Sequence, residues 1–320
     1  MRPLTELEAA IKAQPGELRR LSELDVGQAT KRLASGERVW IVGTGSSWHA
    51  AELGAAMFAR AGIDARPATS NEFARSVRLR AGDGVVVLSH TGSTAYARAA
   101  RQRALDIGAE TVTITGDGVG WPEAIETGPR ERSETYTRSY TGALAVLALL
   151  AGELGAEGLG PEAVVAAADA TERAIAEPGI DAIPEERRLI VYAGLGPGLV
   201  TAREGALKLR EAARLPAEGF DAEYLLHGNA VPLNEQDVLI TLGRDADGFI
   251  ALLAKAAREA KVPTVELDQP DLNDELIEQI PLTAPLQLLA LRRALAGGQD
   301  PDTVIVGSWR DEALWETGAP

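Results

Sequence analysis

The same local pattern occurs twice in this chain. RVWIVGTGSSWHAAELGAAMFARAG at 38–62 is an apolar run, a glycine-rich turn and a helical stretch, and RRLIVYAGLGPGLVTAREGALKLREAAR at 187–214 repeats that order. Aligning Gly43 with Gly194 gives an offset of 151 residues (194 − 43). A buried strand that runs through a tight turn into a helix is the building unit of parallel α/β sheets. The chain is therefore predicted to fold as two similar α/β domains in tandem.

Further strand patterns complete each half. Strands are predicted at 63–69, 84–92 and 110–116 in the first half, with a helix at 71–78, and at 237–243 and 262–268 in the second half. Strands that alternate with helices form a parallel, doubly wound sheet. We therefore predict an N-terminal helical arm at 1–36, a first domain at 37–170 and a second domain at 171–320.

The composition excludes several classes of protein. With no cysteine in 320 residues, the chain has no disulfide, thiolate metal site or cysteine nucleophile. The longest apolar run, ALAVLALLA at 143–151, is far short of the ~20 residues needed to span a bilayer. A formal net charge of −15 repels nucleic acid and anionic membranes. We expect a cytoplasmic protein with neither nucleic acid nor membrane as a partner.

Neither glycine-rich turn has the spacing of a nucleotide site. GTGSS at 43–47 is followed by a tryptophan where the G-x-G-x-x-G fingerprint has its third glycine, and GLGPG at 194–198 has a proline after its second glycine. Neither turn contains a Walker lysine. The three histidines, His49, His90 and His227, lack metal-binding spacing. No cofactor and no metal are expected.

Hydroxyl side chains follow two of the predicted strands in the first half. Ser46 and Ser47 come after the first strand, and SHTGST at 89–94 comes after the third. Because the carboxyl ends of parallel strands share one edge of a sheet, these turns should lie together with helix N-termini beside them. Such uncharged donors suit a phosphate monoester. The alternative is that these residues only cap helices and bind no ligand.

A second candidate cluster lies on the long helix of the second half. In EGALKLRE at 204–211, Glu204, Lys208 and Glu211 are spaced i, i+4 and i+7, so they project from one face. In a functional site Glu211 would act as a carboxylate base. By spacing alone, a solvated helix surface is the commoner explanation, with each pair contributing only ~0.3–0.5 kcal/mol. His227 is by itself either structural or functional.

Four motifs in order resemble the SIS (sugar isomerase) domain family. The similarity covers residues 37 to 300 and is strongest to the isomerase half of glucosamine-6-phosphate synthase and its free-standing relatives. VGTGSSWHAA resembles the family's first sugar-phosphate turn, and SHTGST its S-x-S-G-x-T phosphate loop. EGALKLRE, with His227 sixteen residues after its last glutamate, resembles the EGALKLKE and HGP pair, and PLQLLALRRALAGGQDPD resembles the closing helix.

This resemblance implies two tandem SIS domains, each a flavodoxin-like three-layer α/β/α sandwich with a parallel sheet. It implies that a phosphorylated sugar or amino sugar is held by Ser46, Ser47, Ser89, His90, Thr91 and Thr94. Glu211 would move a proton between C1 and C2, with Lys208 and Glu204 on the same face. His227 would assist ring opening, either within the chain or from the partner subunit of a homodimer. This chemistry requires no metal or nucleotide.

Three departures from the family pattern narrow the expected function. The chain has no cysteine, so the synthase's glutaminase nucleophile is missing and glutaminase activity is not expected. Lys261 is the last lysine, so the tail lysine that forms an imine with the sugar has no counterpart, and Asn229 replaces the proline of HGP. The sequence predicts a phosphosugar isomerase or an amino-sugar-phosphate deaminase or deglycase acting on a hexose or hexosamine 6-phosphate. The alternative is a sensor that binds a sugar phosphate without catalysis.

Overall fold

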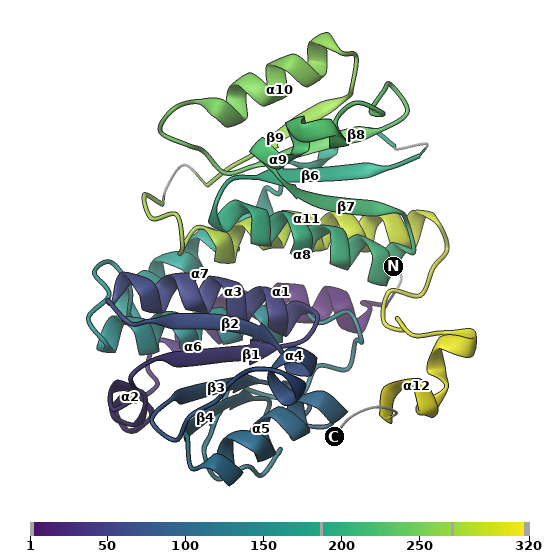
Figure 1. The fold of residues 1–320 in the computed structure, drawn as a ribbon. Helices are drawn as coiled ribbons and strands as arrows, with labels where there is room; N and C mark the ends of the chain where they lie inside the picture. The colour runs from purple at the N-terminus through teal and green to yellow at the C-terminus, as the bar shows by residue number, and fades with distance from the viewer. Residues whose placement is uncertain (1–2, 186–187, 270–271, 317–320) are drawn as a thin grey trace. The chain divides into compact units, whose positions relative to one another are not determined.

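The computed structural model describes residues 3–185, 188–269 and 272–316, which form two compact units. The first-sheet unit contains residues 13–132, 136–166 and 305–316, and the second-sheet unit contains residues 3–12, 133–135 and the described part of 167–304. Each unit holds one parallel sheet (Figure 1). The limits of the helical arm and of the two domains read from the sequence remain a prediction.

The first-sheet unit is built on five parallel strands in the order β2-β1-β3-β4-β5. The strands are β1 (Val39–Gly43), β2 (Ala65–Thr69), β3 (Gly84–Leu88), β4 (Glu110–Thr115) and β5 (Ala124–Glu126). In the central pair, Ile41 of β1 is in register with Val86 of β3. This strand order is that of flavodoxin-like sheets, and it confirms the predicted doubly wound α/β fold. The short strand β5 was not predicted.

Helices cover both faces of this first sheet. They are α2 (Gly27–Ala34), α3 (Ser46–Arg60), α4 (Ser70–Arg75), α5 (Ala95–Ile107) and α6 (Arg138–Glu153). α4 and α5 pack on the face that carries Val42, whereas α3 and α6 pack on the face that carries Ile41, where Gly54 leaves room for Leu147. Successive strand residues point to opposite faces, so the continuous apolar run of β3 supplies both helical layers.

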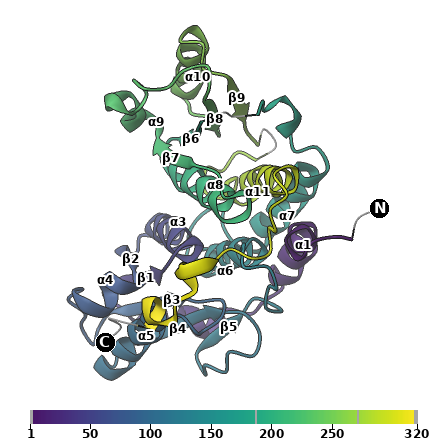
Figure 2. The same cartoon turned by 90° about the vertical axis from the view of Figure 1, so that its right-hand side faces the viewer.

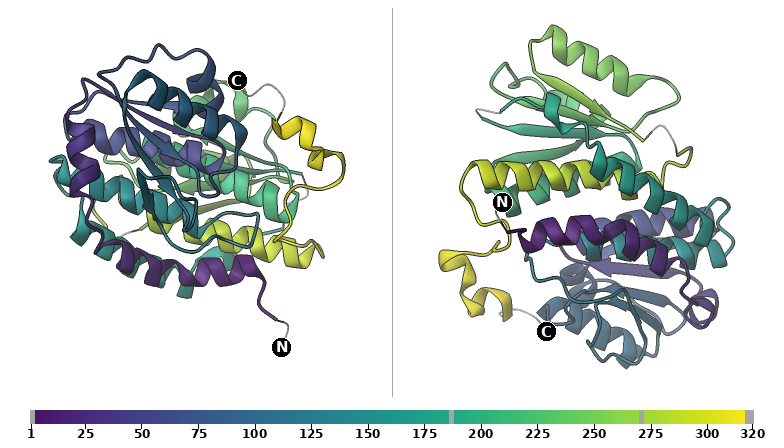
Figure 3. Two further views of the ribbon diagram at one scale, coloured as in Figure 1. Left: turned by 90° about the horizontal axis from the view of Figure 1, so that it is seen from below. Right: turned by 180° about the vertical axis from the view of Figure 1, so that it is seen from behind.

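The second-sheet unit repeats this architecture with four described strands in the order β7-β6-β8-β9. The strands are β6 (Ile190–Gly194), β7 (Ala217–Asp221), β8 (Val238–Leu242) and β9 (Thr264–Leu267), and the main helices are α8 (Pro197–Ala213), α9 (Ala222–Tyr224), α10 (Phe249–Glu259) and α11 (Gln279–Ala296). α8 and α11 pack against Tyr192 and Ile240, and α10 packs on the opposite face against Leu239. Figure 3 shows α11 and α10 on opposite sides of this sheet. The second half thus confirms the internal repeat, with β7 as its unpredicted strand.

The remaining elements precede the first sheet in the sequence, connect the two sheets along the chain, or are short. They are α1 (Glu6–Leu21), α7 (Pro161–Ala176), α12 (Glu312–Glu316) and single turns at Ile180–Ala182, Leu225–Asn229 and Gly307–Arg310. No helix in the described part of the chain is long and apolar enough to cross a membrane. Leu7 and Ile11 of α1 join the apolar core beneath the second sheet.

An arginine and a buried aspartate precede the central strands of each sheet. Arg38 donates to both carboxylate oxygens of Asp83, with Nε–Oδ1 and Nη2–Oδ2 distances of 2.8 and 2.9 Å. Arg188 grips Asp237 in the same manner, and each guanidinium also donates to a nearby loop carbonyl. Burial opposes ionisation of the two aspartates, but the guanidiniums and a backbone N–H hold the pKa of each carboxyl below its usual value. In both sheets, an arginine–aspartate pair therefore joins the segments that precede the two central strands.

The opposite edge of each sheet carries the loops that leave the strands. The chain leaves β1 toward α3 on one face and leaves β3 toward α5 on the other face. The crevice at such a point of divergence is where flavodoxin-like sheets bind ligands. In the first sheet this crevice is formed by residues 44–46 and 89–94, and in the second sheet by residues 195–197 and 243–248.

Candidate active site

The turn after β1 brings the start of α3 directly against the end of the strand. A Cβ on Gly43 would collide with the backbone of Ser47, so only glycine permits this close approach. Gly45 precedes the helix with φ +60° and ψ −131°, a conformation that favours glycine. Ser46 and Ser47 therefore form the first turn of α3, where two of the first N–H groups already donate to the carbonyls of residues 44 and 45.

The turn after β3 gathers the hydroxyl groups that the sequence singled out. The hydroxyl groups of Thr91 and Ser93 lie 2.7 Å apart, and the Ser93 N–H donates to Thr91 Oγ1 at 3.2 Å. Gly92 has φ +65° and lies against Val119, which fixes the turn. Ser89 is buried at the end of the strand. Four of the predicted site residues, at 89, 90, 91 and 94, thus share one short turn.

Two helix N-termini in this crevice lack a side-chain cap. Gly45 precedes α3 and has no side chain, and Thr94 precedes α5 without a side-chain hydrogen bond to the helix. Uncapped N–H groups at a helix start carry a partial positive charge and attract anions. Both N-termini belong to the first-sheet unit and lie beside the hydroxyl groups. Chemically, the arrangement is able to bind an anion such as a phosphate group.

The corresponding crevice of the second sheet is built differently. The carboxylate of Asp245 accepts hydrogen bonds from the N–H groups of Phe249 and Ile250, at 2.7 and 2.8 Å. Burial raises the pKa of Asp245, but these backbone donors lower it more, so the carboxyl stays ionised. Pro197 at the start of α8 has no N–H to offer. An internal anion occupies the start of α10, so this crevice is unsuited to a phosphate group.

His90 is engaged by the protein itself. Its Nε2 accepts a hydrogen bond from the Glu131 N–H at 3.0 Å, and its ring stands edge-on to Tyr136, with ring centres 5.7 Å apart. Burial is the main cause of a lowered pKa for His90; Glu131 opposes it, and the charge of Arg138 reinforces it. The ring is therefore neutral at physiological pH, with its proton on Nδ1. Its Nδ1 has no hydrogen-bond partner among the described residues.

Two arginines border the hydroxyl-rich turn, and the sequence analysis did not identify them. Arg130 donates to the Thr91 carbonyl at 3.0 Å, and Arg138 donates to the Pro129 carbonyl at 2.6 Å. Both guanidiniums lie close enough to lower the pKa of His90. Thr91 and Arg130 are 39 positions apart in the chain, and no spacing rule connects them. The positive charges of Arg130 and Arg138 offset part of the chain's negative electrostatic field at this turn.

The second candidate cluster is buried, so the solvated reading of this helix face is wrong. The side chain of Lys208 is 0% exposed and that of Glu204 is 1% exposed, whereas Glu211 retains 19% exposure. The Lys208 Nζ lies 2.5 Å from Glu211 Oε2 and 3.5 Å from Glu204 Oε1. α8 is packed against α11 and β6, where Gly205 lets Leu286 approach closely. The carboxylate of Glu211 is thus paired with the buried Lys208 side chain but remains partly exposed.

His227 is paired with Glu223 rather than with the buried cluster on α8. Its side chain is 66% exposed, and its Nε2 lies 2.5 Å from Oε1 of Glu223. His227 and Gly228 have non-helical backbone angles within a single π-helical turn, and Asn229 donates to the Tyr224 carbonyl at 3.2 Å. Asn229 therefore stabilises this loop in place of the proline of the family motif. Glu223 was missed in the sequence, although its i, i+4 spacing to His227 is a usable signal.

The structure thus places nine of the ten predicted residues in two separate groups, with His227 in neither. One group lies in the crevice of the first sheet: Ser46, Ser47, Ser89, His90, Thr91 and Thr94. The other group, Glu204, Lys208 and Glu211, lies on α8 of the second-sheet unit. Among the described residues, no group of three or more acidic or histidine side chains has the arrangement of a metal site.

Comparison with known proteins finds relatives in sequence and in fold. No protein-family model matches it. It is 29% identical to the glutamine–fructose-6-phosphate aminotransferase (isomerizing) of Thermococcus kodakarensis, over 87% of this chain and 52% of that protein. For the same enzyme of Gloeobacter violaceus the values are 28%, 91% and 56%. The chain therefore spans about half the length of these relatives, to which it is homologous.

Solved structures share this fold across nearly the whole chain. The tagatose-6-phosphate ketose/aldose isomerase of Escherichia coli aligns with a TM-score of 0.79 at 18% identity, over 96% of this chain and 97% of that chain. The glucosamine-6-phosphate deaminase of Thermotoga maritima aligns with a TM-score of 0.80 at 19% identity, over 93% and 97%. The C-terminal domain of the Francisella tularensis glucosamine-fructose-6-phosphate aminotransferase aligns with 0.76 at 19% identity, over 94% and 98%. By fold, the chain is a two-sheet α/β protein that shares its architecture with these three structures.

Proposed function

We propose that this protein is an enzyme that moves a proton between C1 and C2 of a hexose or hexosamine 6-phosphate. The observation that carries the proposal is the cluster on α8, where buried Lys208 holds the accessible carboxylate of Glu211. A protein that only binds a sugar phosphate has no need of a carboxylate fixed in this way. The homology to isomerizing aminotransferases and the shared fold of ketose/aldose isomerases support the same reaction class.

The phosphate is bound by the crevice of the first sheet in this proposal. Ser46, Ser47, Ser89, Thr91 and Thr94 supply hydroxyl donors, and the starts of α3 and α5 supply backbone N–H groups. Each helix start contributes ~0.3–1 kcal/mol to anion binding, and up to ~2 kcal/mol when partly buried. His90 holds the 131–137 loop beside this turn through its bond to the Glu131 N–H. We therefore assign His90 the role of a positioning residue.

Glu211 acts as the general base on the open-chain sugar. Its carboxylate takes the proton from the carbon next to the carbonyl, and the C–H electron pair becomes the double bond of an enediolate. When the carbonyl re-forms one carbon further along, the proton returns from Glu211 to the neighbouring carbon. Lys208 keeps Glu211 in place, and Glu204 balances the buried ammonium group. In this scheme Glu211 makes both proton transfers at carbon, and the proton that moves between the oxygens on C1 and C2 is exchanged through water.

His227 assists ring opening in this proposal, and a second copy of the chain completes its surroundings. Its pairing with Glu223 suits a proton carrier, because the carboxylate orients the imidazole. Tyr224, Leu226 and Val231 around it are exposed apolar side chains, which a homodimer interface would cover. Light scattering coupled to size exclusion tests this: the wild type is expected to be a dimer, and Val231→Glu should shift it toward the monomer. A wild-type monomer would contradict it.

Two measurements separate the enzyme from a sensor. A thermal-shift screen with hexose and hexosamine 6-phosphates identifies the ligand, because saturation at 100 times the dissociation constant stabilises the fold by ~2.7 kcal/mol. Proton NMR in D2O then follows deuterium entry at C1 or C2 of that ligand, and ammonia release distinguishes a deaminase from an isomerase. We expect both binding and exchange. Binding without exchange would favour the sensor, which is the second candidate because no lysine follows Lys261.

A further inference from the structure

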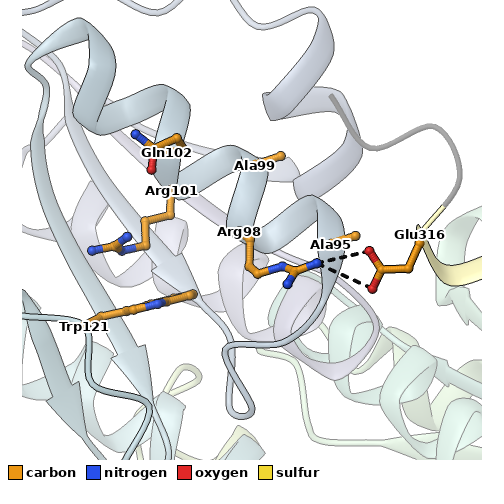
Figure 4. Close-up of a pocket in the computed structure, with 7 residues that line it drawn as sticks. All are labelled: Ala95, Arg98, Ala99, Arg101, Gln102, Trp121 and Glu316. Atoms are coloured by element: carbon orange, nitrogen blue, oxygen red, sulfur yellow. Dashed lines mark hydrogen bonds and ion pairs between the residues drawn. The ribbon is translucent and has the colours of Figure 1, made fainter.

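A hollow of about 470 Å³ lies beside α5, and of its lining residues only Ala95, the first residue of α5, adjoins the candidate active site (Figure 4). Ala95, Ala99 and Gln102 line it from one face of the helix, because they are spaced i, i+4 and i+7. The two alanines are short, so they leave the space open between longer neighbours. Trp121, which follows β4, and Glu316 of α12 complete the lining.

Two arginines of α5 give this hollow its charge. Arg101 pairs with the nearly buried carboxylate of Glu123, and its guanidinium carbon lies 4.8 Å from the ring centre of Trp121. Arg98 instead points across the hollow to Glu316, with its Nη2 3.1 and 3.4 Å from the two carboxylate oxygens. Within the described chain, Glu316 is the only carboxylate that pairs with Arg98. The hollow therefore already accommodates one anionic group.

The segment that carries Glu316 is weakly attached. In the last part of the chain that the structure describes, no side chain of residues 307–316 is buried. Arg98 is 53% exposed and Glu316 is 62% exposed, and exposed pairs of this kind contribute little to stability. Figure 2 shows α12 beside α5, at the surface of the first-sheet unit. An external anion can therefore compete with Glu316 for Arg98.

We propose that this hollow is a binding site for a phosphate ester, and that Glu316 occupies it as an internal competitor. When Glu316 leaves, the lining has one net positive charge, because Arg101 stays paired with Glu123. A phosphate dianion carries twice the charge of a carboxylate, and the planar fork of Arg98 can hold two of its oxygens. The Gln102 amide on the next turn donates to Asp106 Oδ1 at 2.7 Å, and its second N–H can donate to the phosphate. The site is independent of the proposed catalytic function.

The tryptophans provide separate reporters for the hollow and for the first-sheet crevice. Trp121 lines the hollow, and Trp48 lies in the first turn of α3 next to Ser47. We would record the indole N–H resonances of the full-length chain by NMR and assign them with Trp121→Phe and Trp48→Phe. Titration with inorganic phosphate at constant ionic strength then gives an apparent dissociation constant at each reporter.

The expected pattern distinguishes the hollow from every other phosphate contact. Glu316→Gln should tighten phosphate binding at Trp121 by about 1.5- to 5-fold, the factor that corresponds to loss of one exposed pair. Glu312→Gln, on the same segment but outside the hollow, should leave the binding unchanged. Arg98→Gln should abolish the response of Trp121 and spare that of Trp48, whereas Arg98→Lys should retain a weaker response at Trp121.

Two results would overturn the proposal. One is a silent Trp121 in both the wild type and Glu316→Gln, and the other is a Trp121 response that survives Arg98→Gln. A response at Trp121 with a silent Trp48 would support the hollow while it contradicts phosphate binding in the first-sheet crevice. The two proposals can therefore fail separately.

Discussion

The ammonium group of Lys208 lies 2.5 Å from the carboxylate of Glu211 and 3.5 Å from that of Glu204, although the lysine side chain is wholly buried. A buried charge is tolerated when opposite charges and hydrogen bonds surround it. The two carboxylates stabilise one cation, and only Glu211 is accessible from outside. A spacing of charged residues that is common on solvated helices therefore holds the Glu211 carboxylate in a fixed position.

Replacing the lysine tests how strongly the cluster depends on it. Lys208→Met leaves Glu204 buried without its cation, so we expect a loss of ~3–5 kcal/mol in the free energy of unfolding. Adding Glu204→Gln to that variant removes the uncompensated charge and should recover part of the loss. Urea unfolding of the three proteins measures both effects. Equal stability of Lys208→Met and the wild type would mean that the cluster does not support the fold.

Phosphate binding in the first-sheet crevice can be blocked by placing a carboxylate at a helix start, as the second sheet does at α10. Thr94→Asp places a carboxylate at the start of α5, in imitation of Asp245 at the start of α10. Because aspartate is a favoured helix cap, the variant should keep or slightly raise its melting temperature. It should bind fructose 6-phosphate at least ~10-fold more weakly, since the added carboxylate repels the phosphate group. Calorimetry measures the affinity.

The matched control changes the capping residue of the second sheet. Asp245→Asn should lower the stability by ~1 kcal/mol, because the start of α10 loses a charged cap. It should leave fructose 6-phosphate binding unchanged. If Asp245→Asn weakened the binding as much as Thr94→Asp does, the assignment of phosphate to the first sheet would be wrong.

The arginine–aspartate pairs predict how acid unfolds the protein. The pKa values of Asp83 and Asp237 are lowered in the folded state, so their stabilisation is fully present above the unfolded-state pKa and is lost as the pH falls through the folded-state values. Asp83→Asn should cost ~3–5 kcal/mol at pH 7, because Arg38 loses its buried partner. The difference from the wild type should shrink below pH ~4. Urea unfolding at pH 7 and pH 3 measures it; an equal loss at both values would contradict the linkage.

Glu278 produces a pH dependence of the opposite sign. Burial is the main cause that raises the pKa of Glu278 to about 7; the charge of Arg244 opposes this, and Glu275, Asp268 and Asp274 reinforce it. The folded state therefore binds a proton that the unfolded state has already lost, and stability falls as the pH rises from about 4.5 to about 7.

The test replaces that carboxyl with a neutral amide. Glu278→Gln should raise the melting temperature at pH 8 and leave it nearly unchanged at pH 4.5. Glu235→Gln, an exposed glutamate of the same unit, should change neither value. A Glu278→Gln protein that is no more stable than the wild type at pH 8 would show that the folded state tolerates the ionised carboxylate.

The fold was largely predictable because buried parallel strands have a strong local signature. VVVL at 85–88 and VLITL at 238–242 are continuous apolar runs, and both are strands. The two unpredicted strands lack that signal. β7 (AEGFD) contains a glycine and two acids, and β5 (AIE) has only three residues, so each depends on pairing with a neighbour in the sheet.

The candidate residues could be named from the sequence, but their environment could not. The spacing of Glu204, Lys208 and Glu211 indicated a shared face, but burial depends on α11, which comes 66 residues or more after Ala213 in the chain (279 − 213). In the same way, no pattern links His90 to the Glu131 N–H or Thr91 to Arg130. These contacts arise from the packing of loops that are distant in the sequence.

The most direct test of the central claim is deuterium exchange in the Glu211→Gln protein. With the ligand identified by thermal shift, the wild type should exchange the proton at C1 or C2 with D2O. Glu211→Gln should still bind the ligand but lose at least ~10²-fold in exchange rate, because the amide cannot act as a base. Glu218→Gln, an exposed glutamate of the same unit, should exchange at the wild-type rate. Exchange that continues undiminished in Glu211→Gln would contradict the account.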